Sequence, residues 1–450
     1  MKKGKIIDII IENYEFPNIG IGIYNGNKIK VKNTLPEQRA KVLISRKKKD
    51  YYEARLLKQM ESADFEENPS CIHYDLCGGC SRQTVSYQKQ LEIKAEQVLA
   101  LFKKNGLKYH NYHGITPSPL IYEYRNKMEY SFGDMAKDGV LQLGLHPAGR
   151  RFDVITVDEC QLVDEDFRTI LSYILNYCRE HNLKRYHIMN REGCLRHLII
   201  RKGLKTGEIL VNLHTTSSLN HDMKQLTEGL KNLKLKGKLT GFLQTINDDL
   251  SDAIKCEELI VHYGVPYFFE ELLNLRFKIT PFSFFQPNTF AAEKLYQTVQ
   301  SFLSDYENKV ILDLYCGTGT ISQVLAKRAH KVYGIEIVEE AVKVAEENSR
   351  INNLDNCYFF AGDVFEKIEI LPEKPDLIVI DPPRPGINPA ALKKIIALNT
   401  EELIYVSCNP LSLVRDLKEF AAAQYEIKDL KCVDMFPHTH HVETVVLISK

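Results

Sequence analysis

A cysteine near the C-terminus has the sequence surroundings of an enzymatic nucleophile. Cys408 follows the strand-like run 403–406 (Leu-Ile-Tyr-Val). It comes just before Asn409 and Pro410, which are good N-cap and first-turn residues of a helix. Thiolate, the reactive form, is favoured at a helix N-terminus. An isolated cysteine is more often a small buried apolar residue, but this place at a strand end favours a nucleophile.

Two acidic residues border strand-like runs and are candidates for the same chemistry. Asp381 follows the run 376–380 and begins an Asp-Pro-Pro-Arg-Pro-Gly turn, which puts a carboxylate on a rigid turn at a strand end. Glu443 lies at the entry to the last strand-like run, within 436–444, and is a candidate general base. The alternatives are an Asp381 that only caps its turn and a histidine-rich loop without catalysis. Three histidines in this segment also raise a metal site, but no second ligand cluster lies nearby.

A glycine-rich turn predicts a nucleoside cofactor. The strand-like run 310–314 leads into the loop 315–320 (Tyr-Cys-Gly-Thr-Gly-Thr) and then into a helix start. Gly317 and Gly319 let the backbone approach a ligand closely. Glu336, at the end of the next run, can accept hydrogen bonds from ribose hydroxyls. The third glycine of a dinucleotide fingerprint is missing, so NAD and a ligand-free tight turn both stay open from this loop alone.

Four further cysteines are candidates for a metal centre. Cys71, Cys77 and Cys80 lie close together in the sequence. Cys160 can supply a fourth thiolate. We expect no secretory signal in this chain, so its eleven cysteines argue against a disulfide scaffold and for thiols that are buried, metal-binding or catalytic. The spacing leaves zinc and an iron–sulfur cluster as close competitors, with His73 as a less favoured substitute ligand.

The elements expected around the candidate catalytic residues form a doubly wound α/β domain. After residue 281, strand-like runs separated mostly by helical segments occur at 310–315, 331–337, 357–362, 376–380, 402–408 and 443–448. Strands that alternate with helices predict a parallel sheet. Ligands of such sheets bind beyond the carboxyl ends of the strands, which is where Cys408, Asp381 and the glycine-rich loop are expected.

The N-terminal region differs in charge from the rest of the chain. Residues 1–58 contain 14 Lys and Arg against six Asp and Glu, a net charge of +8 in a chain whose total is zero. Short apolar runs on both sides of Asn25–Asn27 predict a hairpin within a small β-barrel. The charge favours a module that binds a polyanion, with chance clustering on a solvated surface as the alternative.

The bulk composition is that of an ordinary globular protein. Hydrophobic residues make up 44% of the 450 positions and charged residues 26%. No apolar run approaches the roughly 18 residues of a membrane helix. We expect a cytoplasmic protein whose partner is nucleic acid and not a membrane. We divide the chain into 1–58, a central region 59–280 with a helix near 88–105, and 281–450.

The motifs together resemble those of the TrmA/RumA-type RNA uracil-5-methyltransferases, closest to the branch that acts on 23S ribosomal RNA. The resemblance covers essentially the whole chain, and the matching motifs are Phe-Phe-Gln-Pro-Asn at 284–288, Asp-Leu-Tyr-Cys-Gly at 313–317, Asp-Pro-Pro-Arg at 381–384, Ser-Cys-Asn-Pro at 407–410 and His-Val-Glu-Thr at 441–444. It implies a Rossmann-like class I methyltransferase domain that uses S-adenosylmethionine. It also implies a TRAM-type, OB-like RNA-binding barrel over 1–58 and an α+β central domain that carries a 4Fe-4S cluster and contacts RNA.

The resemblance implies roles for individual residues. Contacts to the cofactor or the uracil fall on Gln286, Tyr315, Gly317, Gly319, Thr320, Glu336, Asp363 and Asp381. Asp363 is expected near the adenine, and Thr320 stands where some relatives have Asn. The cluster ligands are Cys71, Cys77, Cys80 and Cys160. The helix near 88–105 is expected to pack against the catalytic domain.

These expectations define a reaction. Carbon 5 of uracil is barely nucleophilic, so the Cys408 thiolate adds to carbon 6 and makes an enolate that attacks the methyl sulfonium. Glu443 then removes the carbon 5 proton and the thiolate leaves. We expect the substrate to be 23S rRNA before or during ribosome assembly, modified by a monomeric enzyme.

Two other classes stay open from the sequence. An exocyclic-amine methyltransferase also uses a polar residue before Pro-Pro at a strand end, but it does not need Cys408. A non-catalytic RNA-binding protein, such as a ribosome-assembly factor, does not need Cys408 and Glu443 to act together.

Overall fold

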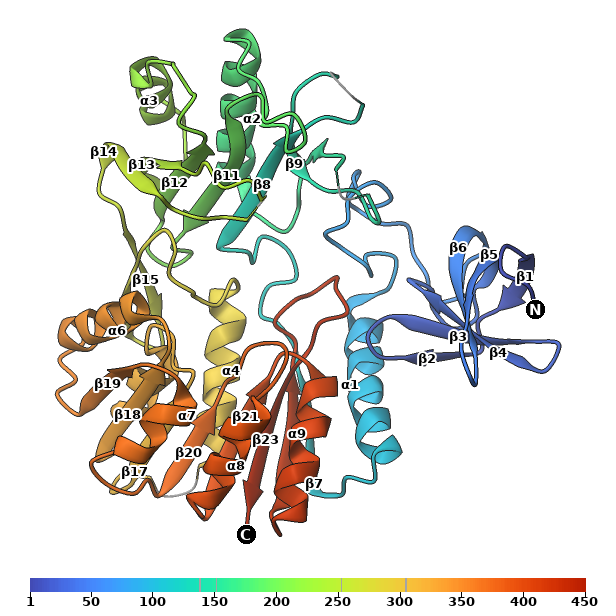
Figure 1. The fold of residues 1–450 in the computed structure, drawn as a ribbon, viewed down its shortest axis with the longest axis vertical. Coiled ribbons are helices and arrows are strands. Elements are labelled where there is room, and N and C mark those ends of the chain that lie inside the picture. The colour runs from blue at the N-terminus through green and yellow to red at the C-terminus, as the bar shows by residue number, and fades with distance from the viewer. Residues whose placement is uncertain (137–138, 151, 252, 304–305) are drawn as a thin grey trace.

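The computed structural model describes residues 1–136, 139–150, 152–251, 253–303 and 306–450. The strands in these ranges form an N-terminal sheet, a central sheet, a short hairpin and a C-terminal sheet (Figure 1). None of the helices in the described ranges is long and apolar enough to cross a lipid bilayer.

The N-terminal sheet is built from six short strands. They are β1 (Ile6–Ile10), β2 (Asn13–Glu15), β3 (Ile19–Tyr24), β4 (Asn27–Lys32), β5 (Arg39–Lys47) and β6 (Tyr52–Glu61), in the order β1-β5-β6-β4-β3-β2. The hairpin expected at Asn25–Asn27 is confirmed: β3 pairs with β4, and Asn25 and Gly26 have φ of 48° and 73°, as a tight turn requires. The amide of Glu12, just after β1, donates to the carbonyl of Ile21 on β3. The sheet is therefore curled, consistent with a barrel-like domain.

The central sheet has helices packed against it. Its strands are β8 (Lys127–Gly133), β9 (Gln142–Leu145), β10 (Ile155–Thr156), β11 (Leu195–Lys202), β12 (Glu208–Thr215), β13 (Lys238–Ile246) and β14 (Glu258–Gly264). Helices α2 (Glu165–Glu180) and α3 (Lys224–Lys231) supply Phe167, Ile174 and Leu226 to the core of this region. The hairpin of β15 (Phe268–Leu272) and β16 (Leu275–Ile279) follows and leads to the C-terminal sheet.

The C-terminal sheet confirms the expected doubly wound α/β architecture. All six strand-like runs after residue 281 form strands, namely β17 (Val310–Leu314), β18 (Lys331–Glu336), β19 (Cys357–Ala361), β20 (Leu377–Ile380), β21 (Glu402–Ser407) and β23 (Glu443–Ser449). The sheet order is β19-β18-β17-β20-β21-β23-β22-β7, where β22 is Glu426–Val433 and β7 is Tyr109–Thr116. Strands β17 to β21 are parallel, whereas β23 is antiparallel to both of its neighbours. The chain changes direction between β17 and β20, where ligands of such sheets bind.

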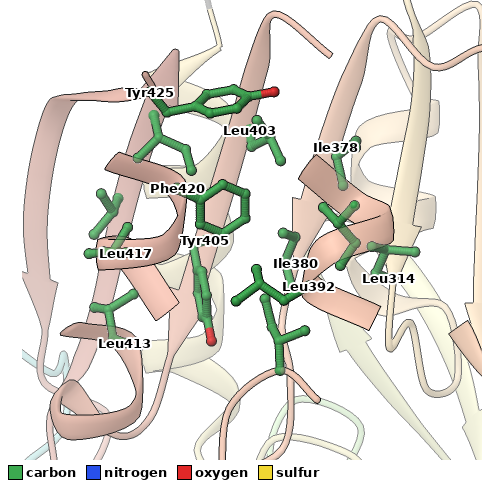
Figure 2. Packing of buried hydrophobic residues seen from close by; sticks show 14 of the residues in the cluster. Leu314, Ile378, Ile380, Leu392, Leu403, Tyr405, Leu413, Leu417, Phe420 and Tyr425 are labelled. Carbon is green, nitrogen blue, oxygen red and sulfur yellow. The ribbon is translucent and has the colours of Figure 1, made fainter. Parts of the chain in front are cut away.

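Helices cover both faces of this sheet, because successive side chains along its strands point alternately into two buried clusters. The helices are α4 (Thr289–Phe302), α5 (Thr320–Ala326), α6 (Glu339–Ile351), α7 (Val364–Lys367), a 3-10 turn (Ile368–Ile370), α8 (Pro389–Ala397) and α9 (Pro410–Ala422). On β21, Leu403 and Tyr405 join one cluster. The intervening Ile404 and Val406 join the other. Figure 2 shows the first cluster, with labelled members Leu314, Ile378, Ile380, Leu392, Leu403, Tyr405, Leu413, Leu417, Phe420 and Tyr425.

Helix α1 (Tyr87–Lys104) and strand β7 belong to this C-terminal layer, although they precede the central sheet in the chain. Val98 and Phe102 of α1 are fully buried in the cluster that includes Leu417 of α9. Figure 1 shows α1 beside α9, and β7 pairs in parallel with β22 at the sheet edge. Val98 and Phe102 of the apolar stripe of α1 are therefore buried in the C-terminal layer. The range 59–280 thus contributes elements to two layers.

Candidate active site

The glycine-rich loop between β17 and α5 has a backbone that glycine makes possible. Tyr315, Gly317 and Gly319 all have positive φ, at 64°, 56° and 74°. A Cβ atom on Gly319 would lie 2.8 Å from the ring of Phe359, whereas one on Gly317 would meet open space. Gly319 therefore allows close packing, and Gly317 leaves an accessible backbone beside the strand end.

Two carboxylates lie beyond the ends of the neighbouring strands. Glu336, the last residue of β18, accepts hydrogen bonds from the amides of Gly317 and Val338, both at 3.0 Å. Asp363 follows β19 and caps α7 by accepting from the Phe365 amide at 2.7 Å. The structure thus brings Glu336 into contact with the glycine-rich loop. It holds Asp363 just beyond the end of the adjacent strand.

A buried carboxyl that the sequence analysis missed supports the same loop. Asp313 on β17 accepts a 2.5 Å hydrogen bond from the Ser322 hydroxyl. Among the described residues, its other oxygen has no hydrogen-bond partner. Burial raises the pKa of Asp313 to about 7, and the charge of Asp381 adds to this. The available signal was an acidic residue inside an otherwise apolar run, because strands of parallel sheets are usually apolar throughout.

The Phe-Phe-Gln-Pro-Asn segment lies against the glycine-rich loop. The Thr318 hydroxyl donates to the carbonyl of Phe284 at 3.3 Å. Gln286 is buried, and its carbonyl accepts a 2.8 Å hydrogen bond from the Asn126 side chain of the preceding region. The structure therefore brings Gln286 into the same neighbourhood as the loop, as the site prediction requires.

Thr320 makes its hydrogen bond within the protein. Its hydroxyl and that of Tyr296 on α4 are 3.2 Å apart. Burial raises the pKa of Tyr296, and the charges of Asp381, Asp313 and Glu443 act in the same direction. Tyr296 was not a sequence candidate, because a tyrosine in an amphipathic helix is indistinguishable from a core residue.

Strand register brings Cys408 opposite Glu443. Strands β21 and β23 are antiparallel, with Ser407 paired to Thr444. Cys408 directly follows β21 and Glu443 is the first residue of β23, so one further step of this register would set them opposite each other. Asp381 directly follows β20, the other neighbour of β21. The three residues thus meet at one edge of the sheet, contributed by three adjacent strands.

The environment of these three residues disfavours negative charge. Burial raises the pKa of Glu443 to about 8, and the charge of Asp381 acts in the same direction. Burial also raises the pKa of Asp381 to about 7. The pKa of Cys408 rises to about 12 through burial and then through the charges of Glu443 and Asp381, while Arg384 opposes the rise. A cation bound beside them would favour the ionised forms.

The histidines before Glu443 lie in a buried turn between β22 and β23. Burial lowers the pKa of His438 and His440 to about 4 and that of His441 to about 3, so all three rings are neutral near pH 7. Within the described ranges, no three His, Cys, Asp or Glu side chains converge on a point that could hold a single metal ion.

The four candidate metal-binding cysteines line one cavity of about 410 Å³, and they are Cys71, Cys77, Cys80 and Cys160. None of them forms a disulfide. Burial raises the pKa of Cys77 to about 11 and that of Cys80 to about 12. The nearby Cys71 and Cys160 raise both pKa values further. Phe284 also lines this cavity, so the cysteines lie close to the Phe-Phe-Gln-Pro-Asn segment.

Comparison with known proteins identifies close relatives. A family model described as tRNA (Uracil-5-)-methyltransferase matches residues 86–363, and a methyltransferase domain model matches 305–444. A protein of Clostridium tetani named "Uncharacterized RNA methyltransferase" is 49% identical over 446 residues, covering 99% of this chain and 98% of that protein. A similarly named protein of Caldanaerobacter subterraneus subsp. tengcongensis is 47% identical over 450 residues, covering 100% of both.

A solved structure also matches over nearly the full length. The crystal structure of Pyrococcus abyssi tRNA (uracil-54, C5)-methyltransferase in complex with S-adenosyl-L-homocysteine superposes with a TM-score of 0.75 at 27% identity. The match covers 98% of this chain and 100% of that one. The similarity therefore extends beyond the C-terminal domain to the N-terminal and central regions.

The buried Glu443 predicts a pH-dependent stability difference. Because its folded-state pKa of about 8 exceeds the ordinary 4.5, folding opposes its ionisation. The resulting loss of unfolding free energy is absent below pH 4.5, grows as the pH rises to 8, and is constant above that. Each unit by which the folded-state pKa is raised contributes about 1.4 kcal/mol to this loss. The unfolding free energy of Glu443→Gln minus that of the native protein should therefore be larger at pH 8.5 than at pH 5.5, as measured by urea denaturation. The exposed Glu96→Gln is the control, and an equal difference at both pH values would contradict the prediction.

Proposed function

Because the chain belongs to the tRNA (uracil-5-)-methyltransferase family, whose members are RNA methyltransferases, we propose that it transfers a methyl group from S-adenosylmethionine to carbon 5 of a uridine in RNA. Cys408 is the nucleophile and Glu443 the general base. The observation that carries this proposal is the register that puts Cys408 and Glu443 at the same end of the β21–β23 pair, with Asp381 on the adjacent strand end.

Covalent catalysis begins at carbon 6 of the uracil. The Cys408 thiolate forms a bond to carbon 6, and the electron pair of the 5,6 double bond moves toward the carbonyl oxygen to give an enolate. The thiol must first lose its proton, which its raised pKa and the nearby carboxyls oppose. S-adenosylmethionine supplies the methyl group and a positive sulfonium charge when bound, and this charge acts with Arg384 to favour the thiolate.

Methyl transfer and elimination complete the reaction. Carbon 5 of the enolate forms the new bond to the methyl group, while the bond from methyl to sulfonium sulfur breaks and leaves neutral S-adenosylhomocysteine. Carbon 5 then carries both a methyl group and a proton. Glu443 removes the proton, the 5,6 double bond re-forms, and the thiolate of Cys408 departs. The raised pKa of Glu443 makes its carboxylate a stronger base than an exposed one.

We assign the glycine-rich loop to the cofactor. The accessible backbone at Gly317 supports this assignment, as does Glu336, whose carboxylate is at the strand end where it would accept hydrogen bonds from ribose hydroxyls. Asp363 is assigned to the adenine end. The remaining residues assigned to the cofactor or uracil pocket are Gln286, Tyr315, Gly319, Thr320 and Asp381.

We propose a 4Fe-4S cluster on Cys71, Cys77, Cys80 and Cys160. In a zinc site the four sulfurs all lie about 2.3 Å from one ion, whereas the thiolates of such a cluster bind different irons. Four cysteines that line one cavity fit either centre, and the motifs that resemble the cluster-bearing branch favour 4Fe-4S. The raised pKa values of Cys77 and Cys80 also suit thiols that need bound cations to ionise. The cluster would cross-link segment 71–80 to the central sheet, and no step of methyl transfer passes through it.

We propose 23S rRNA as the substrate and the N-terminal sheet as an RNA-binding, TRAM-type barrel. The net charge of +8 over residues 1–58 supports phosphate binding, since neutralised phosphates release counterions. The four-cysteine centre favours the ribosomal-RNA branch that the motifs resemble. The Pyrococcus abyssi relative, a tRNA (uracil-54, C5)-methyltransferase, makes tRNA the second candidate. We further propose a cytoplasmic monomer.

The mechanism predicts that two substitutions fail at different stages. Cys408→Ala should bind RNA and S-adenosylmethionine but form no adduct, because the attacking atom is missing. Glu443→Gln should transfer the methyl group and then stall with RNA bound to Cys408, because an amide cannot readily accept the proton. A denaturing gel with labelled RNA, followed by peptide mapping, measures both. Normal turnover by Cys408→Ala would falsify the covalent scheme.

The cluster proposal predicts the metal content of the protein. Anaerobically purified protein should contain four irons and four sulfides per chain, with the broad visible absorption of a 4Fe-4S cluster. Cys80→Ser should lose most of this iron, whereas Cys256→Ser, at an exposed position outside the cavity, should keep it. Stoichiometric zinc without iron or sulfide would contradict the assignment.

The substrate proposal predicts where 5-methyluridine is lost. Deleting the gene should remove 5-methyluridine from 23S rRNA and leave it in tRNA, as measured by mass spectrometry of each purified RNA. Complementation with the native chain should restore the modification, and Cys408→Ala should not. Loss from tRNA alone would move the substrate to the second candidate while leaving the chemistry unchanged.

A further inference from the structure

We infer that three side chains of helix α1 are positioning residues for the general base, an inference that rests on the role proposed above for Glu443. These side chains, Tyr87, Gln90 and Lys94, are called the α1 clamp. They hold the turn 434–438, which leads from β22 into the histidine segment and Glu443. They come from a part of the chain more than 330 residues upstream of that turn.

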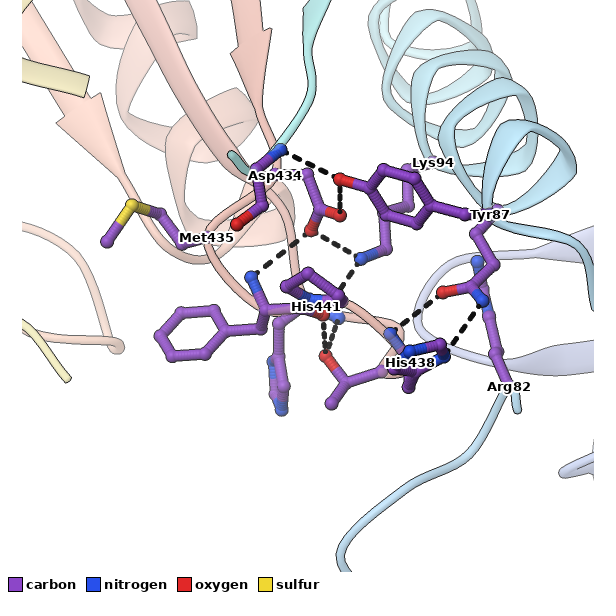
Figure 3. Close-up of polar contacts among 12 residues, drawn as sticks. Arg82, Tyr87, Lys94, Asp434, Met435, His438 and His441 are labelled. Atoms are coloured by element: carbon purple, nitrogen blue, oxygen red, sulfur yellow. Dashed lines mark hydrogen bonds and ion pairs between the residues drawn. The ribbon is translucent and has the colours of Figure 1, made fainter. Parts of the chain in front are cut away.

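A buried ion pair is the centre of the clamp (Figure 3). The Lys94 ammonium lies 2.7 Å from the carboxylate of Asp434, and both side chains are fully buried. The same ammonium donates to the carbonyl of Phe436 at 3.0 Å. The Tyr87 hydroxyl donates to the second Asp434 oxygen at 2.9 Å and accepts from the amide of Ser118. Both oxygens of Asp434 are therefore held by α1.

Gln90 fixes the end of the turn. Its side-chain oxygen accepts from the His438 amide at 2.8 Å, and its amide nitrogen lies 3.2 Å from Nδ1 of the same histidine. His438 has φ of 64°, a conformation that a residue other than glycine keeps only when its surroundings hold it. The backbone amides of Ser81 and Arg82 also donate to the His438 carbonyl. The clamp and the segment after the cysteines thus hold one strained residue.

The turn is connected to Glu443 through a short, hydrogen-bonded segment. Only residues 439–442 separate His438 from the base. Within them, the Thr439 hydroxyl donates to the carbonyl of Phe436 at 2.8 Å and accepts from the amide of His441 at 3.2 Å. Because this segment is short and hydrogen-bonded, a displacement of the turn would also displace the start of β23.

Stability alone does not explain polar residues on this face of α1. A buried ion pair is often no more stable than well-packed apolar residues of similar volume. Tyr87, Gln90 and Lys94 follow each other at intervals of three and four residues, so they share one face of the helix and all point to one turn. What the polar contacts add is a fixed geometry for the turn that precedes the base.

The test compares clamp variants with a variant of the base. Lys94→Met removes the ammonium, and Gln90→Leu removes the contacts to His438 without leaving a buried charge unpaired. Both should accumulate the methylated RNA adduct, as Glu443→Gln does, because a misplaced base slows proton removal after methyl transfer. Turnover should fall on the order of 10²-fold, since a misplacement of about 1 Å costs that much. The Kd for S-adenosylmethionine should stay unchanged.

Lys202→Met is the matched control. Lys202 is a buried lysine of the central sheet that pairs with Asp164 and, at 2.6 Å, with Asp166. Its loss should lower the melting temperature without accumulation of adduct. The inference is overturned if Lys94→Met and Gln90→Leu lose only stability while Glu443→Gln accumulates adduct. Absence of adduct from Glu443→Gln itself overturns the proposed role of the base, and with it the clamp.

Discussion

The antiparallel pairing of β23 with β21 is the constraint on which the candidate site depends. Ser407 pairs with Thr444, and this register ends β21 and begins β23 so that Cys408 and Glu443 follow at the same end of the pair. Side chains on a strand alternate between faces, so a slip by one residue would turn Glu443 away from the thiol and exchange the apolar residues of β23 between the two clusters. The register of β23 therefore fixes the geometry of the site.

The same burial sets the electrostatics of the site. Asp381, Glu443 and Cys408 lie together in surroundings that raise the pKa of each, so the protein itself disfavours three negative charges there. A positively charged methyl donor lowers that cost when it binds. In the proposed reaction this couples the arrival of the donor to the ionisation of the nucleophile, and it leaves a strong base in place for the later proton removal.

Contacts between distant segments hold the site together. Asn288 caps α4 and also donates to the carbonyl of Met435, so the Phe-Phe-Gln-Pro-Asn segment is bonded to the turn before Glu443. Lys94 binds Asp434 in that turn from the other side. Strand β7 extends the catalytic sheet from upstream of the central domain. The catalytic layer is therefore completed by chain that precedes the central sheet.

The sequence by itself determined the local elements and the motifs of this protein. The hairpin at Asn25–Asn27 and the parallel strands could be predicted because turn residues and apolar runs act over a few positions. Cys408, Asp381 and Glu443 could be named as candidates because each stands where a strand-like run begins or ends.

Only the tertiary structure decided which distant residues meet. Lys94 and Asp434 are 340 positions apart, and a lysine in an amphipathic helix reads as solvated until its partner is known. Tyr296 and Asp313 were missed for the same reason, since their roles come from neighbours on other elements. Long-range pairing depends on burial and register across the whole fold, and no local pattern of residues records either.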